Sequence, residues 1–505
     1  MVLEAEATGV RRAWPADVLE RAVEFDFTRP LAFAAFAAVY VATRIPWLNL
    51  GYGADPDAWR VALSADHLLS HGEYLPSRLP GFPLEELVTV PLVRAGWVWT
   101  NLSTVMVSLA GVYLFARLLV ELKLPAKGVL TAAFAFTPLL WINSIVTMDY
   151  MWSLTLVLGC YLALIRRRPL LAGLCMGLAI SFRLTAFWVA FAFIFWLWRE
   201  RRLRSALPFA GAMAVTALVA YSPVLATYGP GMFNFYDAKV SFTGFLKLLG
   251  KDTLGVVGAL AVLAGLAVSL PRLKRLPRDF LVDSHVALWV AVPALVFGSF
   301  TRLPHEVAYL IPLFPFGFFL MARYFQRPVL VAVALLIVLS GFVDITSPGD
   351  EEVSKQTFTS AQIGAGMMLS DLDTLKAQRA YAGDLAAVDI PPHSVVFTGS
   401  IYPQFAMRNK DRLELGILER DHGAISMLTD RGEAVDREND IHYVWLLKYD
   451  AFEAFREQGY NFYYVYDAEG GNASVFHFRP AYYDATEILA GRSPTSGKGT
   501  ASTHR

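Results

Sequence analysis

The stretch LAGLCMGLAISFRLTAFWVAFAFIFWLW at residues 171–198 decides the fold class, because it is almost wholly apolar and holds a single charge, Arg183, near its middle. Basic runs flank it at 166–168 and at 199–204. Cytoplasmic loops of membrane proteins are enriched in Lys and Arg, so both ends are expected on the cytoplasmic side. The stretch then crosses the membrane out and back as two short helices, with Arg183 at their outer junction. A cation in such a place is a functional-site hypothesis.

The composition agrees with a membrane protein. Of 505 residues, 55% are hydrophobic and 17% are charged, whereas soluble domains carry about 25% charged residues. The net charge is zero, which gives the chain no general attraction for nucleic acid. Cys160 and Cys175 both lie in apolar segments, so we expect buried thiols and no disulfide framework. The polar, basic start of the chain predicts an uncleaved anchor as the first apolar span.

A helix needs about 20 apolar residues to cross a bilayer, and about 11 spans are predicted. They lie near 30–48, 97–118, 127–143, 148–165, 169–182, 184–198, 205–226, 253–270, 283–300, 307–323 and 328–344. Basic residues fall on one side of this set, which predicts a cytoplasmic segment at 1–29 and a transmembrane domain at 30–345. The loops at 49–96 and 227–252, and everything after 345, are then outside.

The segment at 346–490 is expected to form a soluble extracytoplasmic α/β domain. SAQIGAGMMLSDLDTLKAQRAYAGDLAAV has the apolar spacing of a helix, and SVVFTG, HYVWLL, NFYYVYDA and SVFHFRP are typical of strands. The last residues, 491–505, are rich in Gly, Ser and Thr and are predicted to be disordered. Nothing in these residues decides what the domain binds.

The first outer loop supplies the first candidate acids. Asp55 and Asp57 follow span one, and Pro56 between them disfavours helix. Residues 57–70 are predicted to form an amphipathic helix on the membrane surface. A carboxylate at this boundary can take a proton from a hydroxyl nucleophile, but the alternative is that Asp57 only caps the surface helix.

Further polar residues are expected on the same outer face. Asp149 opens the fourth span, and TRLPHEVAYLIPLFP places Arg302, His305 and Glu306 close together. Arg and His can hold a phosphate by charge-assisted hydrogen bonds, although a polar turn between helices is the alternative. With Arg183, these groups suit a reaction that has an anionic leaving group. They suit a transporter or flippase less well, because transport sites tend to lie near the midplane.

Two other patterns have weaker functional interpretations. His67 and His71 have the spacing of a helical metal pair, but the Glu that follows the first His in HExxH is missing, so a solvated helix face is preferred. The sequons at Asn101 and Asn472 matter only in a glycosylating compartment.

With these residues placed, the chain resembles the GT-C class of integral-membrane glycosyltransferases, in its protein O-mannosyltransferase and aminoarabinose-transferase branch (family 39-type). The resemblance covers roughly 25–345 and is carried by GADPDAWR, TMDYMWSL, AGLCMGLAISFRLTAF and RLPHEVAYLIPLFP. Each motif alone is weak evidence for the family. Their order along the chain and their expected position on the same side of the membrane make the set more specific. The chain departs from the family in two places: DPD replaces the usual acid pattern, and the Lys of a His-Lys-Glu pattern is absent between His305 and Glu306.

The resemblance implies transfer of a sugar, most commonly mannose, from a polyprenyl-phosphate carrier to a lipid, glycan or protein hydroxyl on the outer face of a bacterial or archaeal plasma membrane. It implies no metal or other cofactor, and displacement with one base implies inversion. Asp55 or Asp57 would be the base, with Asp55 slightly preferred, and Asp149 would assist. The implied roles of the other residues are donor-phosphate binding by Arg183, Arg302 and His305, and substrate binding by Arg60 and Glu306.

Overall fold

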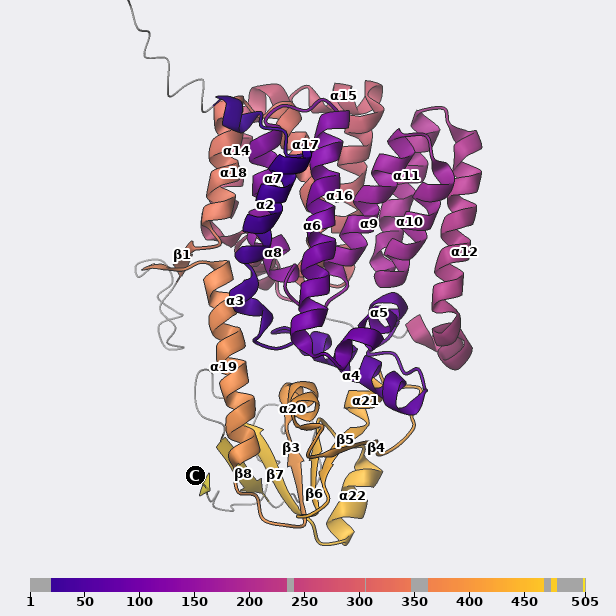
Figure 1. Ribbon diagram of the computed structural model, residues 1–505, viewed down its shortest axis with the longest axis vertical. Helices are drawn as coiled ribbons and strands as arrows, with labels where there is room; N and C mark the ends of the chain where they lie inside the picture. Colours follow the sequence, from indigo (N-terminus) through magenta and orange to yellow (C-terminus); the bar gives the residue numbers. More distant parts are fainter. Residues whose placement is uncertain are drawn as a thin grey trace, which may run out of the picture.

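The computed structural model describes residues 20–233, 240–304, 306–346, 362–466, 474–478 and 503–504. A bundle of apolar helices forms one end of the molecule, and a smaller α/β domain forms the other end (Figure 1). The predicted N-terminal segment at 1–29 is described only from residue 20 onward.

The bundle is that of an integral membrane protein. By length and composition, four helices of the described chain can cross a membrane: α6 (Trp97–Glu121), α12 (Leu203–Tyr228, continued by η2, Gly229–Phe233), α14 (Lys251–Leu273) and α16 (Ser284–Arg302). Seven shorter apolar helices stand beside them: α2 (Pro30–Ala42), α7 (Lys127–Phe136), α9 (Tyr150–Ile165), α10 (Pro169–Phe182), α11 (Phe187–Arg199, preceded by η1, Leu184–Ala186), α17 (Leu313–Tyr324) and α18 (Arg327–Leu339). Each of these helices coincides with one of the predicted spans, so the prediction of about 11 apolar spans is confirmed.

Proline starts several of the bundle helices. Pro138 opens α8 (Pro138–Asn143) directly after α7, and Thr137 between the two helices is extended. A proline fixes φ for the first helical turn and pushes the residue before it out of helical conformation. The predicted span at 127–143 is therefore two short helices with a break between them.

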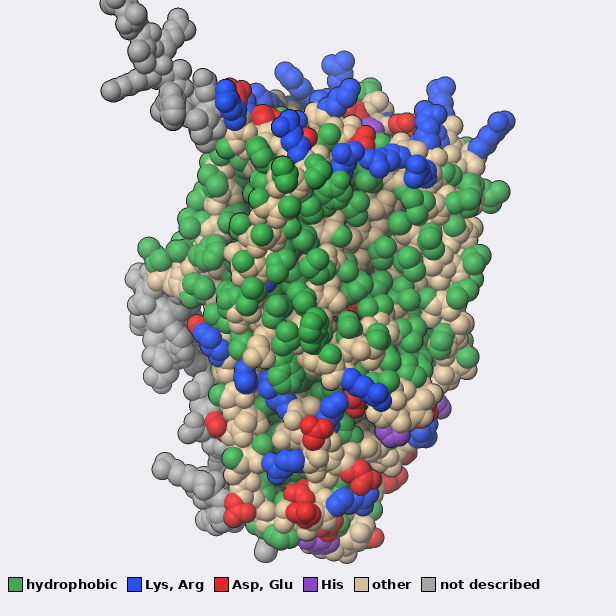
Figure 2. Space-filling view, in the orientation of Figure 1, with side chains coloured by type: hydrophobic (Ala, Val, Ile, Leu, Met, Phe, Trp, Pro, Cys, Tyr) green, Lys and Arg blue, Asp and Glu red, His purple; other side chains and the backbone are tan. Residues whose placement is uncertain are grey.

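Apolar side chains face outward from the bundle. Leu170, Leu207 and Val219 are 65%, 79% and 68% exposed. Exposed apolar surface of this extent is rare on soluble monomers, and it is the surface that lipid covers. Figure 2 also shows that Lys and Arg side chains gather at the end of the bundle away from the α/β domain.

Short helices lie between the bundle and the α/β domain (Figure 1). They are α3 (Ile45–Leu48), α4 (Pro56–His71) and α5 (Pro83–Val93). The predicted surface helix at 57–70 corresponds to α4, whereas α5 was not predicted. The loop predicted at 227–252 contains η2 and α13 (Phe242–Leu249), and a short α15 (Leu276–Val282) joins α14 to α16.

The α/β domain is a mixed sheet flanked by helices. Its strand order is β4-β5-β6-β3-β7-β8-β9, and β3 is parallel to both β6 and β7. The strands are β3 (Ser394–Phe397), β4 (Glu414–Ile417), β5 (Gly432–Asp436), β6 (Ile441–Val444), β7 (Asn461–Tyr466), β8 (Ser474–Phe478) and β9 (Thr503–His504). The helices are α19 (Met367–Ala387), α20 (Tyr402–Asn409), α21 (Met427–Asp430) and α22 (Tyr449–Glu457).

The sequence predictions for this domain hold for its apolar strands. β3, β7 and β8 lie in predicted stretches and β6 overlaps the fourth one, while β4 and β5 were not predicted. The predicted helix at 360–388 contains α19, but its first part is β2 (Gln362–Ala365), which pairs with β1 (Val343–Thr346). The predicted disordered segment at 491–505 and the sequon at Asn472 lie outside the described residues, apart from the two residues of β9.

Candidate functional site

Asp55 is the N-cap of α4, the short helix that lies between the bundle and the α/β domain. Its side chain accepts a hydrogen bond of 2.8 Å from the backbone N–H of Asp57, and Pro56 is the first helical residue. Asp is a favoured N-cap because its carboxylate satisfies an orphan N–H group of the first turn. The alternative that Asp57 caps this helix is therefore wrong, and the Asp57 carboxylate is available to other groups.

Two arginines hold Asp57. Arg60 Nη1 lies 3.0 Å from one carboxylate oxygen, and Arg78 Nε lies 2.8 Å from the other. Arg78 comes from the loop between α4 and α5 and stacks on the ring of Phe82 at 3.9 Å. Arg78 was not predicted from the sequence, although it is a lone arginine between Pro76 and Pro80.

Arg183 lies between the two helices of residues 171–198, where the chain reverses direction, as predicted. Its backbone is extended between α10 and η1, with φ −148° and ψ 110°. Its Nη1 donates to Asp149 Oδ2 at 2.6 Å, and Arg78 Nη2 lies 3.9 Å from the other Asp149 oxygen. Asp149 is 1% exposed and Arg183 is 6% exposed. Arg78 therefore bridges Asp57 and the buried Asp149–Arg183 pair.

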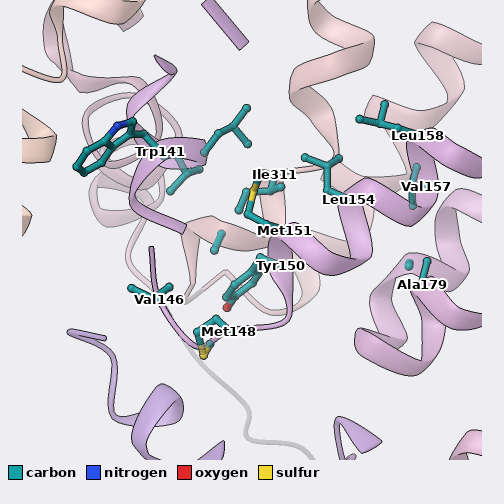
Figure 3. Packing of buried hydrophobic residues seen from close by; sticks show 14 of the residues in the cluster. Trp141, Val146, Met148, Tyr150, Met151, Leu154, Val157, Leu158, Ala179 and Ile311 are labelled. Carbon is teal, nitrogen blue, oxygen red and sulfur yellow. The ribbon is translucent and has the colours of Figure 1, made fainter. Parts of the chain in front are cut away.

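Aromatic rings enclose the Arg183 guanidinium. It lies 3.8 Å from the ring centroid of Tyr150 and 4.6 Å from that of Tyr309. Figure 3 shows Tyr150 at the start of α9 among buried apolar side chains, which include Met148 and Met151. The packed core thus fixes the start of α9 and the acid that precedes it.

Two buried guanidinium N–H groups of this cluster have no acceptor among the described residues. Within the described chain, Nε of Arg183 and Nε of Arg60 have no hydrogen-bond partner. A buried N–H without a partner costs free energy comparable to a lost hydrogen bond. An anionic ligand beside these two arginines would remove that cost.

Of the described residues in the predicted group Arg302, His305 and Glu306, the structure brings only Glu306 close to this site. Glu306 is half-buried and caps η3 (Val307–Leu310), accepting from Ala308 N at 3.0 Å. Burial, and then the charge of Asp55, raise the pKa of Glu306 to about 7. Arg302 is exposed at the end of α16 and joins none of the ion pairs described above. His305 lies outside the described residues.

Asp55 and Asp57 differ in their protonation. Burial, and then the charge of Asp57, raise the pKa of Asp55 to about 6. Burial acts in the same direction on Asp57, but the charges of Arg78 and Arg60 outweigh it and lower the pKa of that carboxyl. Asp55 is therefore the acid of the pair whose pKa lies close to the range that a general base uses at neutral pH.

Helix α5 adds buried carboxyls that were not predicted. Glu86 is 1% exposed and accepts a hydrogen bond from Ser77 N at 2.7 Å and another from the Tyr74 hydroxyl. Burial, and then the charge of Asp149, raise the pKa of Glu85 well above its ordinary value. Both follow Pro83 at the start of α5, and an acidic pair at a helix start is the signal that was available.

The α/β domain also reaches this site. Asp430, at the end of α21, lies 3.7 Å from Arg60 Nη2, and the ring of Trp445 lies 4.4 Å from the Arg60 guanidinium. The backbone N–H of Leu79 donates to the carbonyl of Ile425 at 2.8 Å. No pattern in the sequence pointed to Asp430 or Trp445, because only the docking of the domain brings them near Arg60.

The histidine pair of α4 has another environment. His67 stacks on His71 with centroids 4.4 Å apart, and its Nε2 lies 3.5 Å from Glu73. Among the described residues, no group of three or more His, Cys, Asp or Glu side chains is arranged to hold a metal ion.

The assembled cluster combines a base-competent carboxyl with buried cations. Fixed cations in a water-poor site stabilise developing negative charge much more than they do in bulk water. A displacement reaction needs a base for the attacking hydroxyl and positive charge for an anionic leaving group. Asp55 could act as the base, and the arginines could supply the positive charge.

Two solved structures are similar to this chain. Both are crystal structures of ArnT from Cupriavidus metallidurans. The apo structure has 15% sequence identity and a TM-score of 0.47, and covers 75% of this chain and 85% of its own. The structure bound to undecaprenyl phosphate has 14% identity and a TM-score of 0.49, and covers 74% and 85%. No protein-family model and no curated protein sequence matches the chain.

Proposed function

We propose that this protein is a glycosyltransferase that moves a sugar from a polyprenyl-phosphate donor to an acceptor hydroxyl at the extracytoplasmic face. The observation that supports this most strongly is the Arg183 guanidinium, which is buried, bound to Asp149 through one nitrogen, and left with an unused donor at another. It lies in one cluster with Asp55, whose pKa is about 6. One group suits a leaving phosphate and the other suits an attacking hydroxyl.

The proposed reaction is a single displacement. Asp55 accepts the proton of the acceptor hydroxyl, and the oxygen of that hydroxyl forms a bond to the anomeric carbon. The bond from that carbon to the phosphate oxygen breaks, and the phosphate keeps the electron pair beside Arg183 and Arg60. Attack opposite to the leaving group inverts the anomeric centre.

The donor class comes from the resemblance of the sequence motifs to GT-C enzymes. A polyprenyl phosphate is present in one of the two similar ArnT structures, so this carrier class is the first to test. Mannose is the first sugar to test, and the arginines supply the positive charge without a metal ion.

The test measures sugar transfer by membranes that contain the full chain and a labelled polyprenyl-phosphate mannose, with other pentose and hexose donors in parallel. We expect label to move from the carrier to a product, and chelator to leave the rate unchanged. Labelled donor that crosses the bilayer without product would instead identify a flippase and overturn the proposal.

Asp55→Asn tests the base. Asn caps helices as well as Asp does, so α4 and the thermal midpoint are expected to stay intact. Loss of a general base lowers the rate by about 100-fold or more. Asp373→Asn is the matched control, because its side chain is 71% exposed on α19 and outside the cluster. Equal rates for both variants would contradict the role of Asp55.

A further inference from the structure

A second cluster of cations lines a cavity at the opposite end of the bundle, where Figure 2 shows Lys and Arg side chains. The cavity has a volume of about 470 Å³ and lies between the loop after α6 and the ends of α14, α16, α17 and α18. Its cations are Lys123, Arg272, Arg323 and Arg327. None of them belongs to the proposed transfer site.

Among the described residues, only one of these four cations is in an ion pair with a carboxylate. Arg327 forms ion pairs with Glu20 at 2.9 Å and Glu24 at 3.4 Å. Within the described chain, neither Lys123 nor Arg323 is in an ion pair with a carboxylate.

The other ionisable side chains described at the cavity are one carboxylate, which caps a helix, and one histidine. Asp283 is the only acidic residue among the described lining residues, and its Oδ1 caps α16 by accepting from the N–H groups of His285 and Val286. Tyr161 accepts a hydrogen bond from Trp289 Nε1 at 3.0 Å and lies 2.8 Å from His285 Nδ1. In the tautomer in which the Tyr161 hydroxyl donates to Nδ1, the N–H of neutral His285 is on Nε2. That tautomer gives the cavity one further N–H donor.

Apolar side chains complete the lining. Leu122, Leu124, Trp289, Phe325 and Leu330 lie beside the cations. Arg272 is held in place because its Nη1 donates to the carbonyl of Phe325 at 3.1 Å. A soluble ion needs no such apolar wall, whereas a lipid presents a charged head group joined to hydrocarbon.

We infer that this cavity binds the phosphate-bearing head group of an anionic membrane lipid. Basic pockets between transmembrane helices are suited to such head groups, because each cation near the phosphate adds to the affinity. The same chemistry would fit a soluble phosphate compound, and the experiment separates the two sources.

The full-length protein and its variants are placed in vesicles of phosphatidylcholine with a minor share of phosphatidylglycerol and are then extracted. Native mass spectrometry measures how much lipid each protein retains. We expect wild-type protein to retain phosphatidylglycerol, and the double variant Lys123→Ala, Arg323→Ala to lose about tenfold in retention. The control is Lys274→Ala, Arg278→Ala, which removes the same charge from exposed positions at this end that do not line the cavity.

Each outcome decides the inference. Retention by the control together with loss by the cavity variant supports it. Equal retention by both variants overturns it, because lipid binding then does not depend on the cavity cations. Equal loss from both also overturns it, because binding then depends only on general surface charge. Inorganic phosphate, added to protein in phosphatidylcholine alone, is the second arm. Thermal stabilisation by phosphate that depends on Lys123 and Arg323, without retention of phosphatidylglycerol, identifies a soluble ligand and overturns the lipid assignment.

Discussion

Asp55 and Asp57 stand two positions apart and have opposite electrostatic environments. Asp55 uses one oxygen to cap α4 and is not paired with an arginine within 4.0 Å in the described chain, whereas Asp57 contacts both Arg60 and Arg78. An ion-paired carboxylate is a poor base because its arginines stabilise the ionised form. The local geometry therefore favours Asp55 as the base and gives Asp57 the role of orienting the cations.

This assignment predicts how the transfer rate depends on pH. A base acts only when ionised, and the pKa of Asp55 is about 6. Above that pH most Asp55 is ionised, and below it the rate is expected to fall about tenfold per pH unit. Initial rates between acidic and neutral pH measure this. A midpoint near the ordinary value for Asp, about 4, would contradict it.

Asp57→Asn provides the internal control for that profile. Removing the Asp57 charge takes away one cause of the raised pKa and leaves Arg78 and Arg60 free to act on Asp55. Both effects favour the ionised carboxylate, so the midpoint is expected to move to lower pH. A midpoint that moves upward or stays in place would show that another group controls the rate.

Arg78 is expected to matter for stability as well as for turnover. Arg78→Gln leaves Asp57 and Asp149 with less compensation, and breaking a buried ion pair costs about 3–5 kcal/mol. Arg78→Lys keeps the charge, but an ammonium group cannot contact both carboxylates as the guanidinium does, so partial rescue is expected. The measurements are the thermal midpoint in detergent and the transfer rate.

The control for Arg78 is Arg437→Gln. Arg437 is an exposed arginine whose bidentate partner is Glu414 on the α/β domain. Exposed pairs contribute little to stability, so its thermal midpoint should stay near that of the wild type. An equally small change for Arg78→Gln would refute the bridging role.

At the scale of elements, α4 connects the bundle to the α/β domain. Its Asp66 pairs with Lys410, which follows α20, and Glu73, just beyond α4, forms a bidentate pair with Arg420. The same helix begins at Asp55 and carries Asp57 and Arg60. Docking of the domain on α4 therefore positions Asp430 and Trp445 against the cluster.

A charge exchange tests this coupling. Lys410→Glu places two negative charges together and is expected to weaken docking by about 1 kcal/mol, which corresponds to about fivefold in equilibrium. Asp66→Lys in the same chain restores opposite charges and should recover the loss. Thermal midpoints and transfer rates of the two single variants and the double variant give the coupling energy. Additive losses in the double variant would show that the pair does not hold the domain.

Sequence patterns predicted some of these elements better than others. The spans and strands β3, β6, β7 and β8 are runs of apolar residues, and burial of such runs depends little on the rest of the fold. β4 and β5 contain Glu414, Gly416, Gly432 and Glu433, so neither an apolar run nor an alternating pattern marks them. Arg78 and Asp430 gain their contacts only from long-range packing, which periodicity cannot reveal.

At the scale of the whole molecule, charge distribution defines two different ends. Lys and Arg gather at the end away from the α/β domain (Figure 2), and the cluster around Asp55 lies at the end near the domain. If the basic end is cytoplasmic, the domain and the cluster are outside, as the proposed function requires.

Cysteine labelling in intact cells tests this orientation. Cys160 and Cys175 are free thiols in α9 and α10, so Cys160→Ala with Cys175→Ala gives a background without thiols. Asp411→Cys then places one thiol on the exposed surface of the α/β domain, and Lys274→Cys places one at the basic end. A membrane-impermeant maleimide is expected to label the first in intact cells and the second only after permeabilisation. The reverse pattern would place the Asp55 cluster in the cytoplasm, where an outer-face acceptor cannot reach it.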